Sequence, residues 1–510
     1  MNEPLEDLLA DVRRVAPQVV GYREIAALIE SFGYDDRSAK DLGFPDVFAL
    51  AKHLCTQFPP DPAPEEGAIK NSGWILFKAE ASRAVRKLSL GLAYVVPWAV
   101  LLVLQYLRPD ALQVSPELGG ALSLALIASL ITTGGFIQMI SRSGNFYYGM
   151  EEPFVARSTC ILLLNLGLIS TLLFAMLGLV LSLYFHLFPS SYLTLAAIEY
   201  VALSLLWMFC AVLAVQGLGW CIPLMFVLSA FLIGLIKMLT DCGTIAVLVL
   251  WPALAVLGAI GCMLAGFRRA EKKNPGKRES ASPRHSVWFI SLLPFYGYGA
   301  VYFSFLFADR MAAGSAIPWI SGLSFGIDSS YQRGMDLVLL AFLITAALVE
   351  YLSDSFLRFW RQLAAENPHP GSKPLVASLR QRHWRLMLAT GSVFTAIAAS
   401  AWFAFCHFTA AEVTPRLWQT SVMGGLGYLL LSMALLEIII LASVNSTSAA
   451  LVAVTVGLGV NVLTGYGLSH LLGSQYAAAG LLAGSAVVLW RCTAAVSHIL
   501  RHPDYHYAIS

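Results

Sequence analysis

The sequence predicts an all-α integral membrane protein of about twelve transmembrane helices, preceded by a small helical N-terminal region. Of its 510 residues, 57% are hydrophobic and 13% are charged, whereas soluble domains are about 25% charged. From residue 88 onward, the chain is a series of apolar runs of roughly twenty residues, which is the length that crosses a ~30 Å hydrocarbon layer. Basic residues gather between alternate runs. Together these observations indicate a multi-pass protein whose solvent is lipid.

The N-terminal region, residues 1–58, has the pattern of short amphipathic helices. The apolar positions expected to share helix faces are Leu5, Leu8, Leu9 and Val12, then Ile25, Leu28 and Ile29, then Phe48, Leu50 and Leu54. It has no continuous apolar stretch of the signal-peptide kind, so we expect the chain to start in the cytosol. Residues 59–87 follow as a proline-rich linker and a basic amphipathic segment, which either lies on the membrane surface or extends the first span.

The apolar runs divide the membrane part into two lobes of six helices, residues 88–266 and 286–498, joined by a connector at 267–285 and followed by a tail at 499–510. The predicted spans lie near 88–107, 118–141, 160–186, 192–215, 219–237, 242–266, 286–308, 335–353, 386–408, 418–442, 446–470 and 475–498. Continuous rather than alternating apolar runs exclude a β-barrel. Two repeats related by an axis along the membrane normal are a known transporter plan.

The distribution of basic residues predicts the topology. The connector 267–285 holds seven Lys or Arg, and the segment 354–385 holds six. The loops that alternate with them hold one or two each, such as Arg310 and Arg416. By the positive-inside rule, both termini are expected in the cytoplasm of a bacterial cell, with the chain in the cytoplasmic (inner) membrane.

Ionisable residues inside the spans are the first candidates for function, because they are costly in lipid. Glu199 and Glu437 lie well within the fourth and tenth spans, which are equivalent in the two lobes. They could line a hydrophilic path, act as protonatable switches, or form hydrogen bonds between helices. Glu350 and Lys237 lie nearer span ends and could reach the interface.

The seventh span is the most unusual stretch of the chain, with proline, glycine and tyrosine interrupting its apolar run. Its notable residues are Pro294, Tyr296, Gly297, Tyr298, Gly299 and Tyr302. Proline breaks the helical hydrogen-bond ladder, and interrupted spans bend where neighbours satisfy the freed backbone. Aromatic faces beside hydroxyl groups also suit sugar rings. The alternative is an interfacial aromatic belt with ordinary packing glycines.

Other patterns carry less chemistry. The aromatic segment 142–157 either couples two helical hairpins or is a solvated turn. The eight cysteines are scattered and show no metal or disulfide spacing. No P-loop, HExxH or GxSxG motif occurs. We therefore expect no enzyme activity, no cofactor, no metal and no nucleic-acid partner.

The second half of the chain resembles Pel-type exopolysaccharide exporters, a branch of the MOP flippase superfamily. The resemblance rests on PFYGYGAVYFSFLFADR, on SSYQRGMDLVLLAFLITAALVEYLSDSFLRFWRQL (329–363), on TGYGLSHLL, and on the loop ISRSGNFYYG (140–149). It covers about residues 88–510. The N-terminal 87 residues depart from the family pattern, in which the first span comes almost at once.

The resemblance implies a two-lobed bundle that exports an exopolysaccharide, or its lipid-linked precursor, by alternating access within a biosynthesis and secretion system. It implies partners in the membrane lipid, a cytosolic glycosyltransferase and inner-membrane scaffold proteins. Positions matching the charged family pattern are Asp309, Arg310, Asp336, Glu350 and Arg358. With Glu199, Glu437 and the three tyrosines, they are the candidates for the transport path, whereas Arg142, Tyr148, Arg157 and Arg358 are candidates for coupling between loops.

Three alternatives stay open. A cation-coupled small-molecule exporter would call for an acid deep in the first span, which has none. A membrane transferase would call for a large extracytoplasmic loop, and the largest here is 309–334. A non-transporting scaffold would recruit enzymes through residues 1–87 and the basic loops.

Overall fold

The computed structural model of the protein describes residues 22–31, 34–56, 116–150, 152–185, 189–240, 243–273, 285–317, 328–366, 373–408 and 413–501, with single positions between residues 5 and 95. The chain divides into two compact units, Met1–Arg83 and Ala84–Ser510. Most of the predicted linker and first span, the centre of the connector and the end of the tail lie outside the described residues.

The first unit is a small helical domain around one apolar core. Its described helices are α2 (Tyr22–Ser31), α3 (Asp36–Asp41) and α4 (Val47–Cys55). Their apolar residues pack with the helical positions Leu5, Leu8, Leu9 and Val12. Aspartates begin two of these helices: Asp35 accepts hydrogen bonds from the backbone amides of Arg37 and Ser38, and Asp46 from that of Ala49.

One predicted core position of this unit is wrong. Phe48 was expected on the apolar face of its helix, yet it is 52% exposed. The buried face of α4 is formed by Val47, Leu50, Ala51 and Leu54, which follow the spacing i, i+3, i+4, i+7. Phe48 is one position out of that register, roughly 100° around the helix from Val47, so its side chain lies outside the buried face.

The second unit is a bundle of long helices. The described ones are α6 (Pro116–Gly149), α7 (Pro153–Phe185), α8 (Ser190–Val215), α9 (Cys221–Leu239), α10 (Thr244–Lys273), α11 (His285–Ser315), α12 (Ser329–Glu366), α13 (Lys373–Phe408), α14 (Pro415–Ser443), α15 (Thr447–Leu472), the short 3-10 helix η3 (Ser474–Tyr476) and α16 (Ala477–Arg501). Among the described residues, ten helices are long and apolar enough to cross a membrane, and α9 has a shorter apolar stretch. These eleven helices coincide with predicted spans two to twelve, so the all-α membrane fold is confirmed.

Several helices are longer than predicted, at the expense of the loops. Helix α12 has 38 residues, or ~57 Å at 1.5 Å per residue, whereas the hydrocarbon layer is ~30 Å thick. The segment 354–385, predicted as a loop, is therefore mostly the helical end of α12 and the start of α13. The polar residues of this segment include good helix formers and the i,i+4 ion pair Asp354–Arg358. Such residues continue a helix but are not apolar, so a hydropathy pattern does not reveal them.

The segment 142–157 is also mainly helical. Helix α6 continues to Gly149 and α7 begins at Pro153. Glycine past the end of one helix and proline at the start of the next are the residues preferred there. Three residues, 150–152, lie between the two helices.

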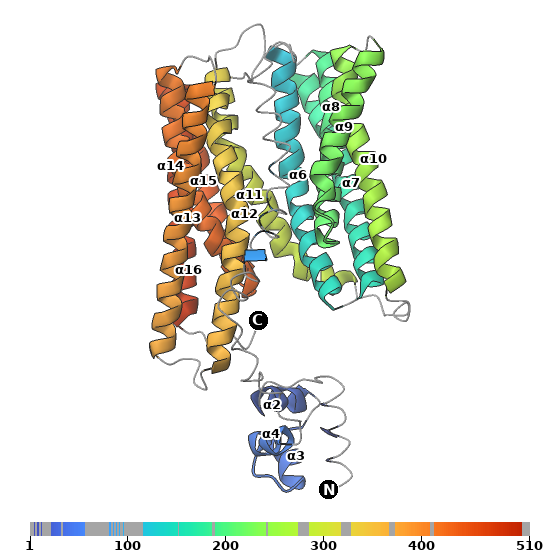
Figure 1. The fold of residues 1–510 in the computed structure, drawn as a ribbon, viewed down its shortest axis with the longest axis vertical. Helices are drawn as coiled ribbons and strands as arrows, with labels where there is room; N and C mark the ends of the chain where they lie inside the picture. The colour runs from blue at the N-terminus through green and yellow to red at the C-terminus, as the bar shows by residue number, and fades with distance from the viewer. Residues whose placement is uncertain are drawn as a thin grey trace. The chain divides into compact units, whose positions relative to one another are not determined.

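The helices form two lobes, each with its own apolar core. We call α6–α10 the first lobe and α12–α16 the second lobe. Helix α11 belongs to both: Trp288 and Leu292 lie in the first core, whereas Phe305, Phe307 and Ala312 lie in the second. Figure 1 shows α11 running between the two groups of helices. Its main contacts are α6 in the first lobe and α15 in the second.

Small residues bring α11 and α6 into close contact. A side-chain carbon at Gly299 of α11 would collide with the backbone of Gly134 in α6, and one at Gly135 would collide with the ring of Tyr296. A related contact occurs in the other direction, since Gly91 of the predicted first span lies against Ala347 of α12.

Candidate functional site

A buried group of charged residues joins α11 to α12 in the second lobe. The Arg310 guanidinium donates from Nη2 to Oδ1 of Asp336 at 2.9 Å. The adjacent Asp309 accepts a hydrogen bond at Oδ2 from the Tyr331 hydroxyl at 2.7 Å. All four residues are buried. The structure thus brings together Asp309, Arg310 and Asp336, three of the predicted candidates, and adds Tyr331.

This charged cluster, defined by Asp309, Arg310, Tyr331 and Asp336, is not fully paired within the protein. With two carboxylates and one guanidinium ionised, it carries an excess negative charge. Oδ1 of Asp309 and Nε and Nη1 of Arg310 are buried without a protein hydrogen-bond partner among the described residues. Buried polar atoms normally find a partner in protein, water or ligand. The cluster therefore has capacity to bind a proton, an ion or a polar group.

Aromatic residues surround this cluster. The Arg310 guanidinium lies 5.7 Å from the centre of the Phe307 ring, an arrangement that favours a cation. Tyr428 of α14 is fully buried, and its hydroxyl has no protein hydrogen-bond partner among the described residues. Neither Tyr331 nor Tyr428 was among the sequence candidates. Tyr331 lies in the polar segment before the eighth predicted span, and Tyr428 is a single tyrosine within an apolar run.

The tyrosines of α11 divide between the lobes. Tyr296 packs edge-on against Phe136 of α6, with ring centres 5.2 Å apart. Tyr298 and Tyr302 face each other at 5.6 Å and pack in the core of the second lobe. The proline at 294 lies within α11, in the part that packs against the first lobe. The interrupted stretch is thus where α11 passes from one lobe to the other.

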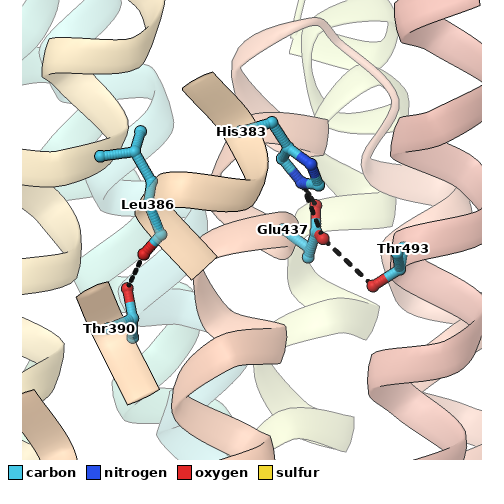
Figure 2. Close-up of polar contacts among 5 residues, drawn as sticks. All are labelled: His383, Leu386, Thr390, Glu437 and Thr493. Atoms are coloured by element: carbon cyan, nitrogen blue, oxygen red, sulfur yellow. Dashed lines mark hydrogen bonds and ion pairs between the residues drawn. The ribbon is translucent and has the colours of Figure 1, made fainter. Parts of the chain in front are cut away.

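A second buried polar group links α13, α14 and α16, as Figure 2 shows. Nε2 of His383 lies 2.9 Å and 3.0 Å from the two carboxylate oxygens of Glu437. The Thr493 hydroxyl donates to Oε1 of the same carboxylate at 3.1 Å. Two turns beyond His383, Thr390 donates to the backbone carbonyl of Leu386. Glu437 is fully enclosed and His383 nearly so.

His383 was not among the sequence candidates. It lies in the segment 354–385 that was assigned to a loop, because Arg380, Arg382 and Arg385 lower the local hydropathy. The available signal was a histidine among arginines, at a position that faces the protein interior if the segment is helical. Only the extension of α13 to Lys373 turns that signal into a buried side chain.

Glu199 and Glu437 lie on equivalent helices but at different depths. Glu199 precedes the end of α8 at Val215 by sixteen residues, whereas Glu437 precedes the end of α14 at Ser443 by six. Glu199 is buried, and its Oε2 has no protein partner among the described residues. The next residue, Tyr200, shares a 2.9 Å hydrogen bond with Thr132 of α6. The two glutamates therefore belong to separate environments.

The remaining candidates lie apart from these groups. Glu350 is on the exposed side of α12. Arg142 is exposed, and its guanidinium carbon lies 5.3 Å from the centre of the Phe295 ring. Arg157 forms a 2.9 Å ion pair with Glu271 of α10. Arg358 forms an ion pair with Asp354 on the same helix. The Tyr148 hydroxyl is buried at the end of α6. In the part of the chain that the structure describes, no three His, Cys, Asp or Glu residues are grouped to hold a metal ion.

Comparison with solved structures identifies the class of fold. A point mutant of the Vibrio cholerae MATE transporter VcmN is 17% identical and covers 84% of this chain and 100% of its own, with a TM-score of 0.55. A MATE protein in the straight conformation is 12% identical and covers 85% and 96%, with a TM-score of 0.55. A multidrug resistance MATE family transporter of the MOP superfamily, in an inward-facing conformation, is 13% identical and covers 84% and 98%, with a TM-score of 0.52.

These likenesses establish a multi-pass membrane protein with the two-lobed fold seen in MATE transporters. No protein-family model matches the sequence, and no curated protein matches it significantly.

Proposed function

We propose that this chain is a transporter that moves a saccharide polymer, or its lipid-linked precursor, across the cytoplasmic membrane by alternating access. The observation that carries the proposal is that α11 belongs to both lobes, with its interrupted stretch between the two parts. A helix shared in this way transmits a bend at Pro294 into a change in how the lobes meet. The solved structures that share this fold are named transporters.

The saccharide as cargo is supported by the sequence resemblance and by the composition of α11. Tyr296 and Tyr302 are only partly buried, and tyrosine offers both an aromatic face and a hydroxyl group to a sugar ring. A glycosyltransferase and scaffold proteins are the proposed partners. The helical domain of residues 1–56 is the part of the chain proposed to recruit them, because it folds around its own core.

A cation-coupled exporter of small molecules is the second candidate function. It is favoured by the presence of two carboxyl groups beside one guanidinium in the charged cluster and by the unpartnered Oδ1 of Asp309. A proton or monovalent cation bound there would relieve the charge imbalance. The two functions differ in cargo rather than in mechanism, since either could be driven through this cluster.

Secretion in the host organism tests the first candidate. Deleting the gene should abolish an extracellular saccharide, the parent gene should restore it, and Asp336→Asn should not, at equal membrane abundance. Arg333→Gln is the matched control, because Arg333 is exposed on the same helix one turn earlier. An unchanged saccharide profile in the deletion strain, together with cation-driven efflux of small molecules from liposomes containing the protein, would establish the second candidate instead.

A further inference from the structure

His383 and Glu437 differ chemically from the charged cluster around Arg310. The guanidinium of arginine is always charged, so the charge of that cluster is partly fixed. Histidine and glutamate side chains, by contrast, each have a protonated and a deprotonated form that differ in charge. The pair therefore has a variable charge in a place from which water is excluded, since both side chains are buried.

Among the described residues, the hydrogen bonds and ion pairs of His383 and Glu437 involve no further ion. On α12, the Phe356 ring covers His383 with ring centres 6.3 Å apart, and the charged residues of that turn, Asp354 and Arg358, pair with each other. On α13, Arg382 donates to Ser355, and Arg385 is exposed. On α16, Thr493 donates to Glu437, Cys492 is buried beside it, and Arg491 is exposed. Glu437 is the ionisable group that α14 contributes.

The number of protons on the pair decides whether it is stable in this packing. With one proton shared, the pair is neutral overall, whichever group holds it. With two protons it carries a positive charge, and with none a negative charge. Either net charge would be buried without compensation, which is strongly unfavourable. A change in proton number therefore requires that water reach the pair or that α13 shift away from α14 and α16.

We propose that His383 and Glu437 form a proton-binding site in the second lobe, separate from the charged cluster, and that the protons bound there control the packing of α13 against α14 and α16. The proposal rests on the proposed transport function for its biological meaning, since a proton site linked to helix packing could drive or regulate alternating access. Thr493 holds the carboxylate in place and is a positioning residue of the site.

Infrared difference spectroscopy of the full-length protein in lipid nanodiscs tests the proton site directly. Spectra are compared between about pH 5 and about pH 9, the range in which histidine titrates. We expect carboxyl and imidazole bands in the parent that are lost in both Glu437→Gln and His383→Gln. Glu271→Gln is the control, because it removes an acid from the ion pair with Arg157 in the other lobe; its spectrum should keep those bands. Identical difference bands in parent and Glu437→Gln would overturn the proposal.

Two further measurements complete the test. The first uses a milder variant, in case Glu437→Gln or His383→Gln does not fold, and the second tests the link between proton binding and helix packing. Thr493→Val keeps the side-chain shape and removes one donor to Glu437, so it should move the pH midpoint of the bands without abolishing them. In the parent, the protection of the backbone amides of residues 373–390 against hydrogen exchange should change with pH, after correction for the intrinsic exchange rate. The same change should be smaller in Glu437→Gln. A pH-independent exchange in the parent would exclude control of packing. Neither measurement involves a saccharide, so a failed secretion test would overturn the proposed function and leave this result standing.

Discussion

The guanidinium of Arg310 on α11 and the carboxylate of Asp336 on α12 form a 2.9 Å ion pair that is buried in the second lobe. The pair joins a helix shared by both lobes to the helix that follows it. Charges are costly to bury, and apolar replacements are often as stable. Stability alone therefore does not account for this pair, and its role belongs to the proposed transport function.

Asp336→Asn is expected to destabilise the protein by about 3–5 kcal/mol, because it removes one partner of a buried ion pair. The double variant Arg310→Met/Asp336→Leu should recover most of that loss while still failing to transport. Thermal unfolding in detergent and saccharide secretion would measure the two effects. A double variant that transports normally would show that the pair is structural only.

Gly299→Ala is expected to weaken the contact between the lobes, because the added carbon would meet the Gly134 carbonyl of α6. The overpacking should cost about 1–3 kcal/mol and reduce transport. Gly178→Ala in α7 is the matched control, since no atom lies within 4 Å of its added carbon. Alanine there should be neutral or stabilising by up to ~1 kcal/mol. Equal behaviour of the two variants would contradict the close contact of α6 with α11.

Pro294→Ala is expected to make α11 harder to bend and to lower the transport rate without loss of folded protein. Alanine restores the backbone hydrogen bond that proline lacks, which stabilises a continuous helix. Pro252→Ala is the control, because Pro252 also lies inside a helix, α10, but within one lobe. Transport should fall only for the position in α11. A normal rate in Pro294→Ala would mean that bending of α11 is not part of the cycle.

Asp35→Ala is expected to loosen the start of α3 in the N-terminal domain. The backbone amide and hydroxyl of Ser38 donate to the Asp35 carboxylate and hold its pKa below the usual value. A lowered pKa means that the contribution is complete at neutral pH and is lost as the pH falls through that pKa. Hydrogen exchange of the α3 amides at neutral pH should become faster in this variant. Asp41→Ala, at the other end of α3, should leave it unchanged.

Much of the fold could be predicted from local sequence, because crossing a membrane requires a length and an apolarity that can be summed along the chain. The apolar runs near 160–186 and 418–442 correspond to α7 and α14. Helix ends beyond the lipid could not be predicted in this way, because polar residues continue a helix without a hydropathy signal. The segment 354–385 shows this most clearly.

The candidate site was predictable only in part. Asp309, Arg310 and Asp336 were identified through a family resemblance, and the tertiary structure decided that Arg310 pairs with Asp336, 26 residues away. The partnership of His383 with Glu437 spans 54 residues, and nothing local in either segment indicates it.

By itself, the sequence determined which segments are apolar helices, where basic residues collect, and which residues interrupt the seventh span. Those properties depend on neighbours along the chain. The tertiary structure decided which buried charges meet, which glycines let α6 approach α11, and that one helix serves both lobes. These depend on the rotation and crossing of helices far apart in sequence, which are set by side-chain packing rather than by hydropathy.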